Sequence, residues 1–215
     1  MLPARVLDLG FCEYLAAWRV QQDLLEARQE DRIEDTLVLV EHPHVLTVGR
    51  NRRRDNLLAP GDMPVVEVER GGDVTYHGPG QLVGYPILRL RDDERDVHRY
   101  LRRLEQAIVA TLADFAITGE QRQGLTGVWA AARKLASIGV AVRRRWVTMH
   151  GFALNVCTDL RRFAAIKPCG LPASVMGSMA SVLGRPVSVA EVQGPLLRHL
   201  GQALNRDWHT PDVIP

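Results

Sequence analysis

Cys169 has the sequence surroundings best suited to nucleophilic chemistry. It lies in the segment KPCGLP, where two prolines and a glycine constrain the backbone and favour an exposed loop. The reactive form of a cysteine is the thiolate, which needs a nearby base or cation. On the residues alone, a nucleophile and an inert thiol are both open. Cys12 and Cys157 lie in apolar patterns and are expected to be small core residues.

Lys134 is a candidate for that cation. It stands directly before the apolar, strand-like segment LASIGVAV, and three alanines and Arg133 precede it. At a strand edge, a lysine is ordinarily a solvated surface charge. A lysine that is partly removed from water and close to a thiol would instead stabilise the thiolate and carry protons. The position of Lys134 in the sequence is compatible with either role.

Residues 70–81, RGGDVTYHGPGQ, combine polar side chains with backbone breakers. Five of the twelve residues are glycine or proline, so the segment is not regular strand or helix throughout. It is either a tight turn with incidental polar residues or a loop that approaches a ligand closely. Two other segments, Ser137-Ile138-Gly139 and His150-Gly151-Phe152-Ala153, carry glycine inside a strand pattern, which is typical of a bulge or of close approach by a ligand.

His42 and His44 form an HxH pair, the spacing of a zinc half-site on one face of a strand. Further ligands are not evident, because His77, His150 and the cysteines lie in other segments. Core or hydrogen-bonding histidines explain the pair equally well. We therefore expect no metal.

The elements that must position these residues are strands and helices in mixed order. Apolar runs and alternation predict strands at residues 5–9, 36–41, 45–49, 65–69, 82–90, 127–130, 135–142 and 147–156. Helical spacing predicts helices at residues 11–30, 96–115 and 188–204, the last with Ser188 and Glu191 as a capping box. Three successive strands without intervening helices argue against a doubly wound parallel sheet. We expect an α/β (α+β) fold with a mixed, mostly antiparallel sheet flanked by helices.

The length and composition indicate the general class of protein. A chain of 215 residues with 46% hydrophobic and 24% charged residues fits one catalytic domain spanning residues 1–215. No apolar run is long enough to cross a membrane, and the start lacks the apolar core of a signal peptide. Three cysteines without a CxxC pair fit a reducing compartment. We therefore expect a cytoplasmic protein without a membrane partner.

Arginine is bunched although the formal net charge is only +2. Runs at 52–54 and 143–145 are either solvated surface or a docking area for an acidic partner. Nucleic acid is not the expected partner, because aromatic residues are sparse and do not alternate with the basic ones.

Five motifs in order resemble the lipoyl(octanoyl) transferases. They are EHPHVLTVGR, RGGDVTYHGPGQLVGYP, RKLASIGV, HGFALNV and KPCGLP, and the resemblance runs from about Glu41 to Leu183. Members of this family resemble biotin and lipoate protein ligases in fold. They transfer an octanoyl group from octanoyl-acyl carrier protein to a lysine of lipoyl domains, in 2-oxoacid dehydrogenase E2 subunits and in glycine cleavage H protein. The resemblance implies no cofactor.

The resemblance also implies residue roles. Cys169 matches the cysteine that carries the acyl group as a thioester, and Lys134 matches its lysine partner. The residues implied to line the acyl pocket come from the second, third and fourth motifs: Arg70, Gly71, Gly72, Asp73, Val74, Thr75, Tyr76, His77, Ser137, Ile138, Gly139, Gly151, Phe152 and Ala153.

Two other classes compete with this reading. An ATP-dependent lipoate ligase would share the fold and a lysine but would need an adenylate site and no thiol nucleophile, so KPCG argues against it. A binding module without enzymatic activity would need neither Lys134 nor Cys169.

Overall fold

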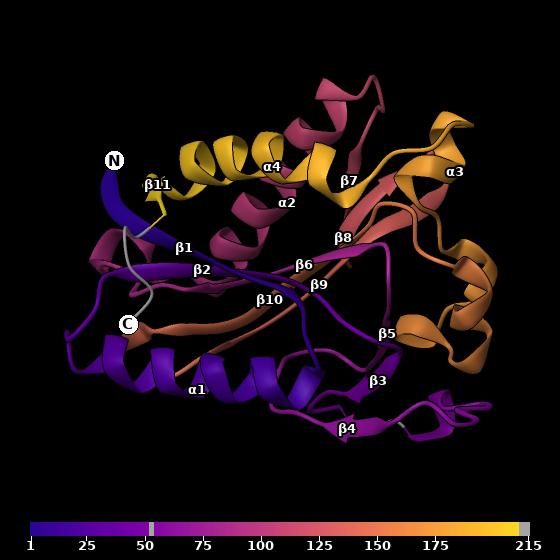
Figure 1. Ribbon diagram of the computed structural model, residues 1–215, viewed down its shortest axis with the longest axis horizontal. Coiled ribbons are helices and arrows are strands. Elements are labelled where there is room, and N and C mark those ends of the chain that lie inside the picture. Colours follow the sequence, from indigo (N-terminus) through magenta and orange to yellow (C-terminus); the bar gives the residue numbers. More distant parts are fainter. Residues whose placement is uncertain (52–53, 211–215) are drawn as a thin grey trace.

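A large mixed sheet forms the centre of the molecule (Figure 1). The computed structural model describes residues 1–51 and 54–210. Among these, the sheet has eight strands in the order β11 (Arg206–His209), β1 (Leu2–Phe11), β2 (Asp35–Glu41), β6 (Gln81–Ile87), β10 (Thr148–Asn155), β9 (Arg133–Val142), β8 (Leu125–Ala130) and β7 (Glu120–Arg122). β1 pairs in parallel with β2 and β11, and the other pairs are antiparallel. The expected mostly antiparallel sheet is confirmed.

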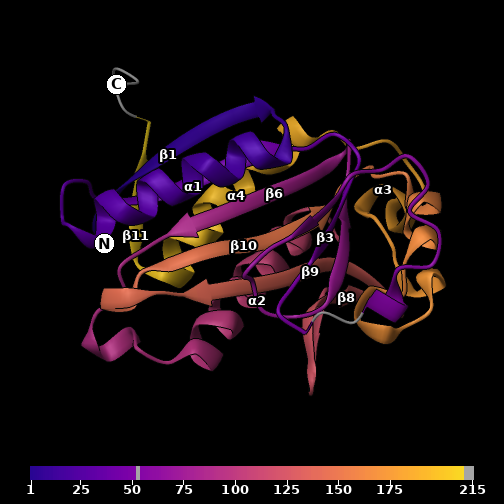
Figure 2. The ribbon, with the colours of Figure 1, turned by 90° about the horizontal axis from the view of Figure 1, so that it is seen from below.

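Helices cover both faces of this sheet. Helices α2 (Val97–Asp114) and α4 (Val189–Leu204) pack together on one face, and α1 (Tyr14–Gln29) lies on the other (Figures 1 and 2). The short helix α3 (Met179–Leu183) lies beside the end of β8. Because both faces are covered, β6 and β10 are buried along their whole length. The large core between the sheet and α2 and α4 includes Leu104, Ile108 and Leu196.

Helix starts follow the local sequence. The Asp96 carboxylate accepts a hydrogen bond from the Arg99 backbone N–H at 3.0 Å and begins α2. Ser188 and Glu191 form the expected capping box of α4, with the Ser188 N–H donating to Glu191 at 2.7 Å. These contacts satisfy backbone donors that a helix start leaves without partners. Both predicted helices are confirmed to within one residue at each end.

A smaller sheet holds the glycine-rich stretch against the large one. Its strands are β4 (Val65–Glu67), β3 (Val45–Val48) and β5 (Val74–His77), and it lies on the same side of the large sheet as α1 (Figure 1). The Gly71 N–H donates to the Val140 carbonyl of β9 at 2.8 Å. Strand β5 and this bond bring residues 70–77 across the face of β9 and β10.

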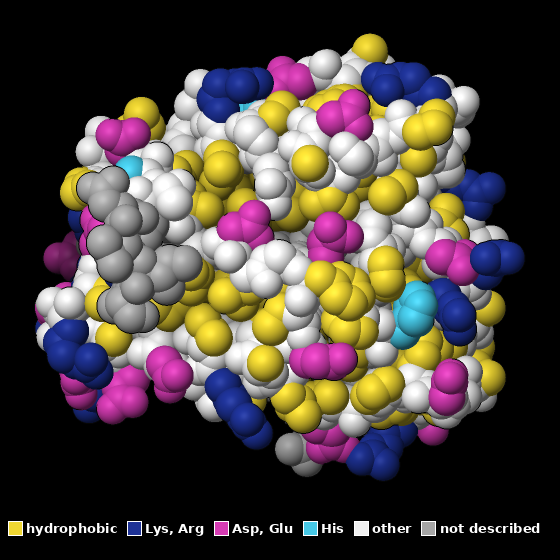
Figure 3. All heavy atoms as spheres, viewed as in Figure 1, with side chains coloured by type: hydrophobic (Ala, Val, Ile, Leu, Met, Phe, Trp, Pro, Cys, Tyr) yellow, Lys and Arg dark blue, Asp and Glu magenta, His cyan; other side chains and the backbone are white. Residues whose placement is uncertain are grey.

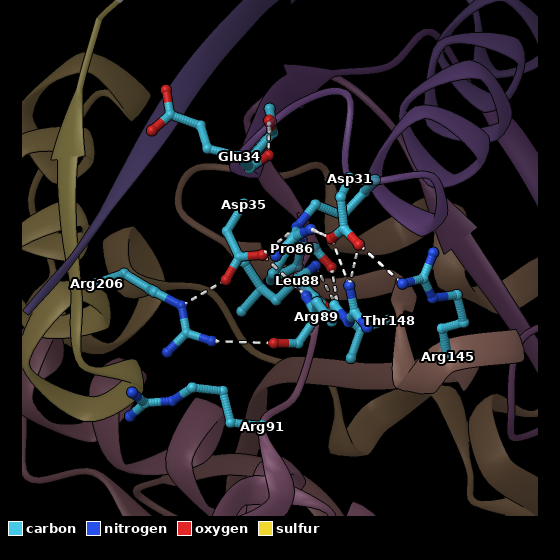
Figure 4. Close-up of polar contacts among 12 residues, drawn as sticks. Asp31, Glu34, Asp35, Pro86, Leu88, Arg89, Arg91, Arg145, Thr148 and Arg206 are labelled. Carbon is cyan, nitrogen blue, oxygen red and sulfur yellow. Dashed lines mark hydrogen bonds and ion pairs between the residues drawn. The ribbon is translucent and has the colours of Figure 1, made fainter.

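A buried ion-pair network ties the C-terminal strand to the rest of the fold. Arg206 is 1% exposed and pairs with Asp35 of β2 at 2.6 Å and with Glu94 at 2.9 Å. Figure 4 shows the Arg206 guanidinium directed at the Asp35 carboxylate, and Asp31 between Arg89 and Arg145. The charges are satisfied by one another, so their burial is tolerated.

Two predictions about the N-terminal region are wrong in detail. Phe11 was expected on the apolar face of the first helix, but it ends β1 and is 64% exposed. Strand β1 continues past the predicted end because its register shifts between Asp8 and Phe11, which is typical of a bulge.

None of the helices formed by residues 1–51 and 54–210 is long and apolar enough to span a membrane.

Candidate functional site

A cavity that is partly open to solvent lies between the glycine-rich stretch and the strands β9 and β10. The cavity is lined by Tyr14, Arg70, Gly71, Gly72, Asp73, Val74, Thr75, His77, Tyr85, Lys134, Ser137, Ile138, Gly139, His150, Gly151, Phe152, Ala153, Pro168 and Cys169.

Lys134 and Cys169 meet in this lining. The Lys134 Nζ lies 3.8 Å from the Cys169 Sγ. Lys134 is 3% exposed, whereas Cys169 is exposed. A thiol at the surface and an ammonium group beneath it are placed so that the positive charge stabilises a thiolate, while the sulfur stays accessible to a large partner.

The Cys169 backbone has a conformation unusual for a residue with a side chain. It has φ 55° and ψ 31°, inside a single 3-10 turn at Pro168–Gly170. Left-handed dihedrals in residues other than glycine cluster at functional sites, because the surroundings must hold the strained backbone. Here Lys167 N–H donates to the Asn56 carbonyl at 2.8 Å and Gly170 N–H to the Lys167 carbonyl at 3.1 Å. These bonds hold the thiol at the cavity rim.

Arg70 is a buried cation in the cavity wall. Its guanidinium donates to the hydroxyl and the carbonyl of Thr47, both at 2.9 Å, and to the Gly71 carbonyl at 3.0 Å. Burial lowers the pKa of Arg70 from its ordinary value. These neutral acceptors hold the glycine-rich stretch in a fixed shape around the cavity.

Two histidines near the cavity are neutral. Burial lowers the pKa of His42 to about 4 and that of His77 to about 3. His42 Nδ1 lies 2.7 Å from the Cys12 carbonyl, which can only accept, so Nδ1 carries the proton and Nε2 accepts from the Tyr85 hydroxyl at 2.8 Å. Burial also raises the pKa of Tyr85 well above its usual value.

The side chains of His42 and His44 do not converge on a common metal site. His42 and His44 follow β2 in the connection to β3, and their side chains contact Tyr85 and Tyr76 respectively. Within residues 1–51 and 54–210, no group of three or more His, Cys, Asp and Glu side chains is arranged to hold a metal ion.

All of the residues proposed for the site except Tyr76 line the cavity. Successive side chains of a strand point to opposite faces, so Thr75 and His77 of β5 face the cavity while Tyr76 faces away. Tyr76 packs edge-on against Phe163 at 5.0 Å between ring centroids. Four lining residues are additional to the proposed set: Tyr14, Tyr85, His150 and Pro168.

Among these additional residues, His150 shows the clearest structural signal. It is 1% exposed, and its backbone has φ 58° although it lies in β10. Its Nε2 lies 3.6 Å from Glu69 Oε1, and burial lowers the pKa of His150. In the sequence, the one indication that His150 belongs to the site was its position beside Gly151 in the segment HGFA. Tyr14 lies in the predicted first helix and Tyr85 near the end of the second motif, and neither position carries a chemical pattern of its own.

The expectation that Cys157 is a core residue is wrong, since its side chain is exposed. It follows Val156 just past the end of β10, and the backbone N–H groups of Val156 and Cys157 both donate to the Gly80 carbonyl. Cys12 is partly buried beside a small core cluster under α1. Although the residue is exposed, partial removal of its sulfur from water and the nearby Glu41 raise the pKa of Cys157.

The run at 143–145 lies apart from Cys169, whereas Arg54 of the other run begins a 3-10 turn, Arg54–Asn56, beside the Cys169 loop, where the Asn56 carbonyl accepts the Lys167 N–H at 2.8 Å. Arg52 and Arg53 lie outside the described residues. Arg143 to Arg145 follow the end of β9 that is remote from Lys134, about 30 Å along the strand. Arg143 pairs with Glu69 at 3.3 Å and Arg145 with Asp31 at 2.8 Å. On the face shown in Figure 3, basic and acidic side chains are interspersed. Docking of a carrier on these arginines stays a prediction.

Comparisons with known proteins show the family to which the chain belongs. The model of the lipoyl protein ligase A/B catalytic domain family matches residues 13–201. An octanoyltransferase of Syntrophotalea carbinolica is 47% identical over 203 residues, which are 94% of this chain and 95% of the relative.

Solved structures share the fold at low sequence identity. A bipartite lipoate protein ligase of Thermoplasma acidophilum aligns with a TM-score of 0.77 at 16% identity, over 100% of this chain and 88% of that one. A biotin protein ligase of Aquifex aeolicus aligns with a TM-score of 0.59 at 12% identity, over 94% of this chain and 70% of that one. The expected fold is thereby confirmed. The chain belongs to the lipoyl protein ligase A/B catalytic domain family, among its octanoyltransferases, and is an acyltransferase of protein lipoylation.

Proposed function

We propose that the chain transfers an octanoyl group from octanoyl-acyl carrier protein to a lipoyl-domain lysine through a thioester on Cys169. The observation that carries this proposal is the 3.8 Å contact between Lys134 Nζ and Cys169 Sγ at the cavity rim. The acceptors are lipoyl domains of 2-oxoacid dehydrogenase E2 subunits and glycine cleavage H protein.

The first half-reaction forms the acyl-enzyme. The Cys169 thiolate attacks the thioester carbonyl of the donor, and the bond between that carbonyl and the carrier sulfur breaks. The Lys134 ammonium group gives a proton to the departing carrier thiolate and becomes neutral. A thioester of equal activation is thus formed on the enzyme, so this step needs neither ATP nor a metal.

The second half-reaction forms the amide. The amine of the acceptor lysine attacks the carbonyl on Cys169, and neutral Lys134 accepts the proton that the amine loses. The Cys169 thiolate leaves, which restores the starting pair. Dividing the transfer into two steps lets each protein partner approach the same exposed sulfur in turn.

The cavity supports the acyl part of this proposal. Its wall includes the glycines of the 70–72 and 137–139 segments. A Cβ on Gly139 would lie 2.8 Å from the Gly71 carbonyl oxygen, so the absence of a side chain lets the two segments pack together as one continuous wall, and the acyl chain would lie in the cavity that this wall bounds. Burial of the octanoyl chain in this space stabilises the complex by about 0.8 kcal/mol per methylene.

Intact-protein and peptide mass spectrometry after mixing with octanoyl-acyl carrier protein tests the proposal. We expect one hydroxylamine-labile octanoyl group on Cys169 and its disappearance when a lipoyl domain is added. Cys157→Ala is the matched control, because Cys157 is also an exposed thiol and should be dispensable.

Two results would contradict the proposal. One is normal turnover by Cys169→Ala with the acyl group found on another residue. The other is activity that requires ATP with free octanoate, which would favour the ligase reading instead.

A further inference from the structure

Lys134 is held in place by a glycine on the neighbouring strand. A Cβ built on Gly127 of β8 would lie 2.6 Å from Lys134 Cε and 3.3 Å from Lys134 Nζ. The Gly127 backbone has φ 126°, which side chains disfavour. The lysine side chain therefore rests directly on the Gly127 backbone.

The pairing of β8 with β9 is irregular at the same place. Val128 pairs with Ala136, but Trp129 pairs with Lys134, so β9 contains one extra residue between these pairs. A bulge of this kind redirects the adjacent side chains. The placement of the Lys134 ammonium group thus depends on the local path of β8, and any shift of Gly127 moves it relative to Cys169.

A buried carboxylate holds Gly127. Glu105 of α2 is 0% exposed, and its Oε1 accepts the Gly127 backbone N–H at 2.8 Å. The other carboxylate oxygen contacts Arg102, one turn earlier on α2. Removal of a buried acceptor leaves its donor without a partner, which is unfavourable, so Gly127 would move to find another acceptor.

We propose that Glu105 is a positioning residue for the acyl transfer: it holds Gly127, and Gly127 holds the Lys134 ammonium group against Cys169. The inference rests on the proposed roles of Lys134 and Cys169. It assigns to a helix on the far face of the sheet a function in the site, through one hydrogen bond and one van der Waals contact.

Two conservative variants separate the position of the oxygen from the charge. Glu105→Gln keeps an acceptor oxygen at the same distance from Gly127 and loses the charge. Glu105→Asp keeps the charge, but its side chain is one methylene shorter, so the oxygen withdraws from the Gly127 N–H. We expect Glu105→Asp to slow alkylation of Cys169 by iodoacetamide near neutral pH roughly tenfold or more. Glu105→Gln should stay within about threefold of the parent enzyme.

Glu94→Asp is a matched control. Glu94 is also buried, accepts a backbone N–H (from Arg91, at 3.0 Å) and pairs with an arginine, but it lies in the network of Arg206. The variant Glu94→Asp should lower the unfolding midpoint as Glu105→Asp does, but it should leave the alkylation rate of Cys169 unchanged. All rates are compared well below the unfolding midpoint of the least stable variant.

Alkylation is followed on the Cys169 peptide, so it does not depend on any acyl donor and remains informative if no octanoyl thioester forms. In a Lys134→Ala background, Glu105→Asp should cause no further slowing, because its effect acts through the lysine. With the octanoyl donor, Glu105→Asp alone should have a lower kcat than the parent enzyme. Its KM should be unchanged, because the cavity is intact.

Three outcomes would overturn the proposal. They are an unchanged alkylation rate in folded Glu105→Asp, an equal slowing with and without Lys134, and the reverse order of the two variants, which would assign the effect to charge.

Discussion

His77 and Gln81 are joined across the glycine-proline turn by a hydrogen bond of 2.7 Å between Nδ1 and Oε1. The Gln81 amide nitrogen donates to Asn155 Oδ1 at 2.9 Å and to the Tyr76 carbonyl at 3.2 Å, so its oxygen is the acceptor. His77 Nδ1 must then donate, and Nε2 is left with a lone pair. The GPGQ turn therefore fixes one neutral tautomer of a cavity histidine.

Neutral buried histidines make the fold sensitive to acid. The pKa of His77 is lowered to about 3 and that of His42 to about 4 by burial, whereas an unfolded histidine titrates near about 6.5. Below pH about 6.5 the unfolded chain binds protons that the folded chain does not, so the free energy of unfolding decreases as pH falls. Each histidine contributes a slope of up to about 1.4 kcal/mol per pH unit.

Urea denaturation at several pH values between 6.5 and 5 measures this slope. We expect His42→Gln to reduce it, because a glutamine does not titrate. His98→Gln, at an exposed position on α2, is the control and should leave it unchanged. An identical slope in His42→Gln and the parent would show that His42 is not the source.

Replacement of Lys134 separates its charge from its proton. Lys134→Ala should slow both Cys169 alkylation near neutral pH and octanoyl transfer, because the cation placed 3.8 Å from the sulfur is removed. Lys134→Arg should preserve more of the alkylation rate but little transfer, since a guanidinium does not give up its proton in proteins. Wild-type alkylation and turnover in Lys134→Ala would contradict the role assigned to this lysine.

The cavity predicts a preference for chain length. A hexanoyl donor buries two methylenes fewer than an octanoyl donor, a loss of roughly 1.6 kcal/mol, so its kcat/KM should be about 15-fold lower. Acylation of the enzyme by hexanoyl and octanoyl thioesters of one common thiol measures the ratio without changes in docking. Equal values would mean that the chain does not enter the cavity.

The Arg206 network predicts a large loss of stability remote from the chemistry. Arg206→Ala leaves the buried carboxylates of Asp35 and Glu94 without their shared cation and should lower the free energy of unfolding by about 3–5 kcal/mol. Arg161→Ala removes an ion pair from a side chain that is 91% exposed and should cost less than about 1 kcal/mol. Urea unfolding compares them. A loss of similar size in both variants would contradict the role of burial.

Much of this protein is visible in its sequence because local interactions encode it. The capping box of Ser188 and Glu191 and the apolar spacing of α2 depend on residues three or four apart, and both were predicted closely. Cys169 and Lys134 were proposed for the site from their motifs, which are also local features, and the structure places the two side chains 3.8 Å apart.

The rest depended on contacts between distant segments. The sequence does not show that Glu105 accepts the backbone N–H of Gly127, 22 residues later, or that Lys134 lies against Gly127, because the irregular β8–β9 register decides these contacts. Nor does it show that Tyr76 turns away from the cavity while His77 faces it, since that follows from which face of β5 meets the large sheet. Motifs and periodicity determined the family resemblance and most of the elements. The register and packing of the strands, which are settled only when the whole core forms, decided which side chains share the site.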